Sequence, residues 1–112
     1  MRGKMTMTVE ELIKQQLQNN NVLLYMKGTP SEPQCGFSAQ AISMLNDLGV
    51  EYATVDVLAN PKLRSTVKEV TSWPTFPQLH VEGELIGGCD IMMNHYQSGE
   101  LKQILADFIK QQ

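Results

Sequence analysis

The first half of the chain alternates amphipathic segments with short apolar runs. A capping box, Thr8-x-x-Glu11, opens a segment with an apolar residue on every turn, which predicts a helix with one core-facing stripe. The continuous apolar run 22–26 predicts a buried strand, and a second apolar face from residue 38 to Gly49 predicts another helix. The apolar positions of the two helices are Val9, Leu12, Ile13 and Leu17, then Ala39, Ile42 and Leu45.

Residues 51–57 continue the pattern with alternating apolar positions, which predict a second strand. Because two predicted strands flank one helix, we expect them to pair in parallel through a right-handed crossover. Asn60-Pro61 has the chemistry of a helix N-cap followed by proline at the first helical position. The apolar side of this third helix is expected to contain Leu63, Val67 and Val70.

The proline-rich segment 73–77 is unsuited to a helix or a central strand, so it predicts a shaped turn. A hairpin is expected after it, with strands at 78–81 and 85–86 around the turn 82–84. Asp90 is expected to cap a fourth helix, which Gly99 separates from a last one. The order α-β-α-β-α-β-β-α-α predicts an α/β protein with a four-stranded mixed sheet and helices on both faces.

Length and charge narrow the class of protein. The 112 residues fit one domain, expected over 8–112 after a flexible segment 1–7. The net charge of −3 argues against non-specific binding to nucleic acid or anionic membranes. No long apolar segment follows the first residues, so neither a membrane span nor a secretory signal is expected. We therefore expect a reducing, cytoplasmic location, or an organellar matrix if the N-terminus is a processed end.

Cys35 is the main candidate for chemistry. It follows the first predicted strand and the loop 28–34 and lies near the start of the next helix, where unpaired N–H groups and the helix dipole favour the thiolate. Lys27 adds a cation at the end of the strand. Ser38 occupies the position of the second thiol in a Cys-x-x-Cys motif, so a disulfide on Cys35 needs an outside thiol or Cys89 to resolve it.

Four separated motifs together resemble those of the monothiol glutaredoxins of the CGFS class. They are Lys27-Gly28-Thr29-Pro30, Cys35-Gly36-Phe37-Ser38, Trp73-Pro74-Thr75-Phe76-Pro77-Gln78 and Gly87-Gly88-Cys89-Asp90. Their order and spacing agree with that class, as does the long loop after Lys27, and the similarity runs from about Val9 to Phe108. The resemblance implies a thioredoxin fold.

The resemblance also implies a glutathione site. Lys27 and Arg64 match cations that lie near the glycyl carboxylate, and Phe76, before a cis Pro77, matches the residue whose backbone pairs with the cysteinyl part. Cys89 and Asp90 match the residues that hold the γ-glutamyl end through a backbone N–H and a carboxylate. The predicted glutathione-binding residues are Lys27, Cys35, Gly36, Phe37, Arg64, Phe76, Pro77, Cys89 and Asp90.

The same family binds a [2Fe–2S] cluster, which needs four thiolate-like ligands. The resemblance implies a homodimer bridged by one cluster, with Cys35 of each chain and one glutathione per chain as ligands. Such a cluster is labile, which suits a carrier that delivers it to apo iron–sulfur proteins. Partners of the BolA type, in heterodimers, are implied as well.

Two other functions remain open at this stage. The first is a glutathione-dependent thiol-disulfide oxidoreductase in which Cys35 is the nucleophile that removes glutathione from proteins. The second is a redox sensor that forms a Cys35–Cys89 disulfide. Cys89 has three possible roles. It could be a resolving thiol, a small buried residue, or a residue that contributes only its backbone N–H as a donor. The two histidines, His80 and His95, fit no metal spacing with the cysteines, and Trp73 is expected to be a packing anchor.

Overall fold

The computed structural model describes residues 7–110 and follows the predicted order of elements. The expected flexible segment 1–7 lies outside the described residues, apart from Met7. No helix in the described part of the chain is long and apolar enough to cross a membrane. The elements are α1 (Val9–Asn19), β1 (Val22–Met26), α2 (Gly36–Leu48), β2 (Ala53–Asp56), α3 (Pro61–Thr71), β3 (Gln78–Val81), β4 (Glu84–Gly87), α4 (Cys89–Ser98), α5 (Glu100–Ile104) and a final 3-10 turn (Ala106–Phe108).

The strands form the predicted mixed sheet, in the order β2-β1-β3-β4. β1 pairs in parallel with β2, with Met26 opposite Asp56, and antiparallel with β3, with Tyr25 opposite Gln78. β3 and β4 form the predicted antiparallel hairpin, whose turn is Glu82-Gly83, both with positive φ. The expected topology is therefore confirmed for the described residues.

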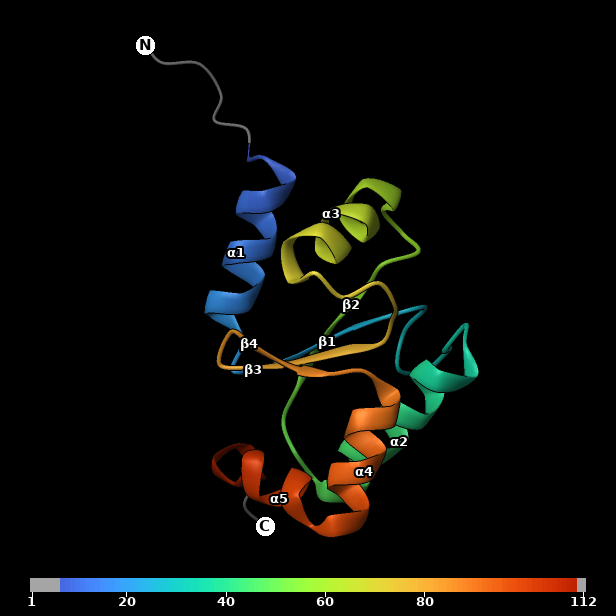
Figure 1. Ribbon diagram of the computed structural model, residues 1–112, viewed down its shortest axis with the longest axis vertical. Helices are drawn as coiled ribbons and strands as arrows, with labels where there is room; N and C mark the ends of the chain where they lie inside the picture. The colour runs from blue at the N-terminus through green and yellow to red at the C-terminus, as the bar shows by residue number, and fades with distance from the viewer. Residues whose placement is uncertain (1–6, 111–112) are drawn as a thin grey trace.

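The helices cover the sheet in two layers. Figure 1 shows α1 and α3 on one side of the sheet and α2, α4 and α5 on the other. All five residues of β1 are buried, and they alternate between the two layers as strand geometry requires. Leu23 and Tyr25 join the core under α1 and α3, whereas Leu24 and Met26 join the core under α2, α4 and α5.

Several helix ends are determined by the local sequence and were predicted correctly. In the capping box, the Glu11 N–H donates to Thr8 Oγ1 at 3.1 Å and the Thr8 N–H donates to Glu11 Oε1 at 2.8 Å. The N-cap Asn60 accepts a hydrogen bond from the Leu63 N–H at 3.1 Å, and α2 is followed by the C-cap Gly49, whose φ is 70° and whose N–H donates to the Asn46 carbonyl. These contacts satisfy backbone groups that a helix end leaves unpaired.

Three sequence predictions were wrong in detail. Ala39 is exposed, because the buried face of α2 consists of Ser38, Ala41, Ile42, Met44 and Leu45. Val70 is 53% exposed, since it lies beyond the last turn of α3 that packs on the sheet. Asp90 is not the N-cap of α4: the helix starts at Cys89, directly after β4, so Gly88 is the cap and Asp90 lies exposed in the first turn.

A buried polar network stabilises the proline-rich turn. The Gln78 side-chain amide donates to the carbonyls of Trp73 at 3.0 Å and Thr75 at 3.3 Å, and its oxygen lies 3.1 Å from His80 Nε2. The His80 ring packs edge-on against Tyr25, with 5.5 Å between centroids. Because His80 is only 2% exposed, burial lowers its pKa to about 4. His80 is thus a buried structural residue.

The buried His80 predicts a loss of stability in mild acid. The unfolded chain takes up a proton near pH 6.5, whereas the folded chain resists protonation until about pH 4. The stabilisation is therefore complete above pH 6.5 and is lost as the pH falls towards 4, with about 2 kcal/mol of the loss between pH 7 and pH 5. Urea unfolding at these two pH values measures it.

Two variants control this experiment. His80→Gln keeps an N–H donor and does not titrate, so its free energy of unfolding should change less between pH 7 and pH 5 than that of the native chain. His95→Gln, at the surface, should behave like the native chain. Equal pH dependence of the native and His80→Gln proteins would contradict the prediction.

Candidate functional site around Cys35

Cys35 lies at the end of the connection between β1 and α2. β1 and β2 run in parallel, so their C-terminal ends meet at one edge of the sheet, the usual location of ligand sites in α/β proteins. The chain leaves β1 through Lys27, turns through residues 28–34 and enters α2 at Cys35, which is the N-cap and is partly exposed. The predicted strand, loop, cysteine and helix are confirmed.

The loop before Cys35 is closed by its own hydrogen bonds. The Gln34 N–H donates to the Lys27 carbonyl at 2.9 Å, and Thr29 and Glu32 exchange backbone hydrogen bonds of 3.2 and 3.0 Å. Gly28 has φ of +92°, and a Cβ there would lie 2.5 Å from the Glu32 carbonyl oxygen. The tight loop therefore requires glycine at this position.

Ser38 has a structural role that its position in the sequence did not reveal. Its side chain is fully buried, and its hydroxyl oxygen accepts the Lys27 N–H at 3.1 Å. This contact joins the end of β1 to the first turn of α2. The serine therefore satisfies a backbone donor, in addition to leaving Cys35 without a neighbouring thiol.

The start of α2 activates the Cys35 thiol. The backbone N–H of Ser38 makes the largest contribution, and the N–H of Phe37 and the charge of Lys27 add to it, so the pKa of Cys35 falls below its ordinary value. Partial burial opposes this change without reversing it. The structure therefore favours a thiolate at Cys35, as the sequence predicted.

Cys89 has the opposite environment. It is the first residue of α4, is 8% exposed, and its thiol donates a hydrogen bond to Gln40 Oε1 at 3.2 Å. Burial raises the pKa of Cys89, and the negative charges of Asp90 and Cys35 raise it further. Both cysteines are free. One chain therefore offers one activated thiol and one thiol that stays protonated.

A cavity of about 260 Å³ lies beside the start of α4. It brings together three of the predicted site residues, Phe37, Cys89 and Asp90. Four more residues line it that the sequence analysis had not assigned to the site: Trp73, Thr75, Gly88 and Ile91. Trp73 had been expected only to pack. A Cβ on Gly88 would lie 3.3 Å from the Trp73 indole nitrogen, so the two segments approach each other closely here. In the sequence, the Trp-Pro turn and the Gly-Gly pair were the only signal of this approach.

Of the other predicted residues, Pro77 lies next to this cavity, because its carbonyl oxygen is 3.3 Å from the place where a Cβ on Gly88 would lie. The Phe76–Pro77 peptide bond is cis, as predicted, and both residues are buried at the end of the proline-rich turn. Gly36 is exposed in the first turn of α2, with nothing within 4 Å of the place where a Cβ would lie. Phe37 is 60% exposed. Gly36 and Phe37 therefore present an accessible surface directly after Cys35 in the chain.

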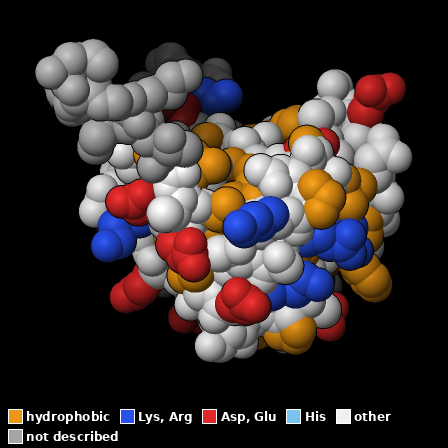
Figure 2. Space-filling model, turned by 90° about the horizontal axis from the view of Figure 1, so that it is seen from above, with side chains coloured by type: hydrophobic (Ala, Val, Ile, Leu, Met, Phe, Trp, Pro, Cys, Tyr) orange, Lys and Arg blue, Asp and Glu red, His pale blue; other side chains and the backbone are white. Residues whose placement is uncertain are grey.

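The two predicted cations come from different segments. Lys27 follows β1, and Arg64 lies in the first turn of α3; both are partly buried. Among residues 7–110 the buried Arg64 Nε has no hydrogen-bond partner. Figure 2, which looks onto the side of the molecule that α1 and α3 cover, shows basic side chains lying among apolar ones. A donor without a partner is suited to an anionic ligand.

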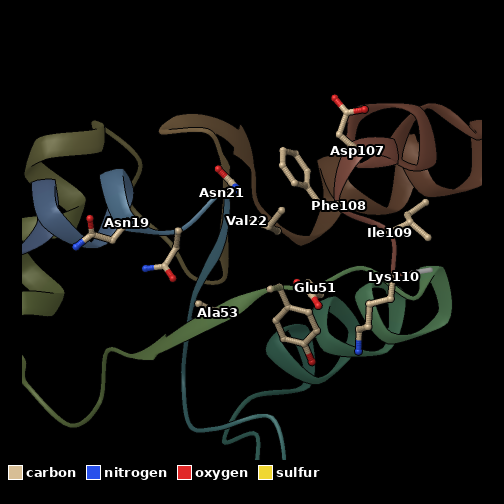
Figure 3. Close-up of a pocket in the computed structure, with 11 residues that line it drawn as sticks. Asn19, Asn21, Val22, Glu51, Ala53, Asp107, Phe108, Ile109 and Lys110 are labelled. Carbon is tan, nitrogen blue, oxygen red and sulfur yellow. The ribbon is translucent and has the colours of Figure 1, made fainter. Parts of the chain in front are cut away.

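A larger groove of about 550 Å³ lies away from the cysteines. Its lining includes Asn21 and Val22 at the start of β1, Glu51 before β2, and residues near Phe108 (Figure 3). These are the N-terminal ends of the parallel strands, opposite the end that carries Cys35. The smaller cavity is the better candidate because the N-terminus of α4 borders it and Phe37, two residues after the activated Cys35, lines it, although Cys35 itself does not.

The histidines take no part in the site. His80 is buried in the sheet, and His95 pairs with Glu100 at 3.1 Å between Nδ1 and Oε1. In the described part of the chain, no three His, Cys, Asp or Glu side chains come together to hold a metal ion. A single chain therefore lacks a complete set of metal ligands among these residues.

Comparison with known proteins agrees with this geometry. The glutaredoxin family profile matches residues 22–86. Glutaredoxin 4 of Escherichia coli K12 is 50% identical over 103 residues, which cover 92% of this chain and 89% of that protein. A Rickettsia felis protein named "Probable monothiol glutaredoxin 2" is 48% identical over 95 residues, which cover 85% of this chain and 91% of the other.

The fold has solved counterparts as well. The solution structure of a monomeric truncated mutant of Trypanosoma brucei 1-C-Grx1 matches with a TM-score of 0.80 and 42% identity, over 91% of this chain and 92% of the other. The expected thioredoxin fold is therefore confirmed.

The environment of Cys35 predicts its reactivity. In a Cys89→Ser background, where Cys35 is the sole thiol, the pH dependence of iodoacetamide alkylation should give a pKa below that of free cysteine. Lys27→Ala should raise this pKa, because a nearby positive charge is lost. Lys110→Ala, at the opposite end of the sheet, should leave it unchanged. A pKa equal to that of free cysteine would contradict the assignment.

Proposed function

This chain belongs to the glutaredoxin family, in its monothiol class, and from that premise we propose that it binds glutathione and carries a labile [2Fe–2S] cluster to apo iron–sulfur proteins. In this proposal the cluster is the cargo of the protein, and a homodimer holds it. The observation that supports the proposal is the contrast between the two thiols: Cys35 is activated and partly exposed, and Cys89 is buried and protonated.

The thiol contrast determines how many ligands one chain can supply. A [2Fe–2S] cluster needs four thiolate-type ligands. Cys89 is a poor ligand, because its thiol donates to Gln40 and its pKa is raised. Each chain then contributes Cys35 alone, and two chains contribute two of the four thiolates. The remaining two ligands are assigned to the thiols of two glutathione molecules, one for each chain.

The candidate site has a partner for each end of glutathione. Lys27 and Arg64 are assigned to the glycyl carboxylate, because charge-assisted hydrogen bonds to carboxylates are strong and the Arg64 Nε has no partner among the described residues. The backbone of Phe76 is assigned to the cysteinyl part. The N–H groups at the start of α4 and the exposed Asp90 carboxylate are assigned to the γ-glutamyl carboxylate and ammonium.

Exchangeable ligands suit transfer. Half of the proposed ligands are small molecules, so the cluster is held weakly enough to be passed on. The subunits are exchangeable as well in this proposal: a partner protein of the BolA type replaces one of them, and a heterodimer results. A thiol that must stay reduced favours the cytoplasm as the place of action. Nucleic acid and membranes are not partners in this proposal, because the net charge of −3 favours neither.

The second candidate function is a glutathione-dependent oxidoreductase, and the lowered pKa of Cys35 favours it. In this reaction the Cys35 thiolate attacks the glutathione sulfur of a protein–glutathione disulfide and releases the protein thiolate. A second glutathione thiolate then attacks the Cys35–glutathione disulfide, which yields glutathione disulfide and frees Cys35. Ser38 lacks a thiol, so the resolving thiol comes from outside or, in the redox-sensor alternative, from Cys89.

Anaerobic reconstitution with iron, sulfide and glutathione separates these functions. The carrier predicts a coloured dimer that becomes a colourless monomer when glutathione is removed, as measured by visible absorption and size exclusion. Cys35→Ser should abolish cluster binding with little loss of fold, because this side chain is outside the core. Cys89→Ser is the matched control and should retain the cluster.

Three outcomes argue against the carrier. A cluster that persists in Cys35→Ser would remove Cys35 as the ligand. A colourless monomer that acts on glutathionylated substrate would favour the oxidoreductase. A species on non-reducing gels that disappears in Cys89→Ser would favour a Cys35–Cys89 disulfide sensor.

The cation site gives an independent prediction. Lys27→Ala and Arg64→Ala should each weaken glutathione binding by about tenfold to a hundredfold, because each removes a charge-assisted hydrogen bond worth roughly 1.5–3 kcal/mol where it is well formed. The cluster should then decay faster at limiting glutathione. Lys110→Ala is the control for the loss of one positive charge. Cluster lifetimes that match the native protein in both variants would refute the assignment.

A further inference from the structure

One carboxylate oxygen connects two segments that approach the site from different parts of the chain. Asp56, the last residue of β2, accepts the Gly28 N–H and the Leu58 N–H at Oδ1, each at 2.9 Å. The bond to Leu58 is local, two residues along, and by itself is an ordinary turn contact. The bond to Gly28 spans 28 positions of sequence, so only the folded chain makes it.

The two connected segments carry the two cations of the site. Gly28 directly follows Lys27 and begins the loop that leads to Cys35. Leu58 lies in the short connection from β2 to α3, whose first turn contains Arg64. Asp56 therefore links the segment of one cation to the segment of the other through a single acceptor atom.

The pairing of β1 with β2 does not depend on the hydrogen bond between Gly28 and Asp56. The Val57 N–H donates to the Met26 carbonyl at 2.9 Å, which holds β1 to β2 at this edge without any side chain. The loop also keeps its internal bonds, including the one from Gln34 to Lys27. Loss of the Asp56 carboxylate thus releases the Gly28 N–H, which is buried, while the sheet remains paired.

We propose that Asp56 is a positioning residue for the glycyl end of glutathione: its Oδ1 fixes the loop of Lys27 relative to the α3 connection of Arg64. This inference rests on the proposed function, because it concerns the same ligand. Asp56 itself does not touch the ligand. It acts by holding two cations in place before the carboxylate arrives, which lowers the ordering cost of binding.

Two substitutions test the role of the shared acceptor. Asp56→Ala removes it, whereas Asp56→Asn keeps an oxygen in the same place and removes the charge. Glutathione and its glycyl monoethyl ester are titrated into the reduced, cluster-free protein, and binding is followed by NMR. The ester lacks the carboxylate that the two cations are proposed to bind.

We expect Asp56→Ala to bind glutathione about tenfold more weakly than the native protein does. Its affinity for the ester should stay within about twofold of the native protein's affinity for the ester. Asp56→Asn should stay within about twofold for both ligands. Equal losses for glutathione and the ester, no loss in Asp56→Ala, or equal losses in the Ala and Asn variants would each overturn the proposal.

Amide hydrogen exchange separates a failure of this inference from a failure of the proposed function. The Gly28 amide should exchange faster in Asp56→Ala than in the native and Asp56→Asn proteins, whether or not glutathione binds. Unchanged exchange would refute the contact. If the native protein binds neither ligand, the proposed function fails and the positioning role fails with it, while the exchange rates still report whether Asp56 holds the loop.

Discussion

Everything around Cys35 depends on the burial of β1 between two layers of helices. All five residues of this strand are buried and alternate between two apolar cores, so a shift by one residue would bring the polar Asn21 or Lys27 into the buried span. Its end is therefore fixed. The Lys27 N–H just beyond it must find a partner off the sheet, and the Ser38 hydroxyl provides one. That contact places the first turn of α2, and hence Cys35, at the edge of the sheet.

The same architecture separates the chemistry of the two thiols. Each cysteine lies at the start of a helix, Cys35 as the N-cap of α2 and Cys89 as the first residue of α4. Position at a helix start is therefore not sufficient to lower a pKa. Cys35 has backbone N–H groups and a cation near it, whereas burial and the nearby negative charges of Asp90 and Cys35 keep Cys89 protonated. Because of this difference, Cys35 is the thiol suited to act as a nucleophile or as a ligand, whereas Cys89 only lines the cavity.

Hydrogen bonds hold together the segments that surround the cysteines. The loop 28–34 closes on itself, Asp56 ties it to the β2–α3 connection, and Gln78 holds the proline-rich turn by two carbonyls. The elements that would hold glutathione are thus in place before it binds. Preorganisation of this kind gives affinity at a small entropic cost, which suits a protein whose proposed ligands must also be exchangeable.

The order of elements, the sheet, the capping of α1 and α3, and the position of Cys35 were all predictable from the amino-acid sequence, because they depend on periodicity and on neighbours within a few residues. Its four motifs also identified the family. Four other features became visible only in the folded chain: Asp90 does not cap α4, Trp73 lines the cavity, Cys89 donates to Gln40, and Asp56 accepts a hydrogen bond from Gly28. Burial and contacts between distant segments exist only after the helices pack on the sheet, so no local pattern encodes them.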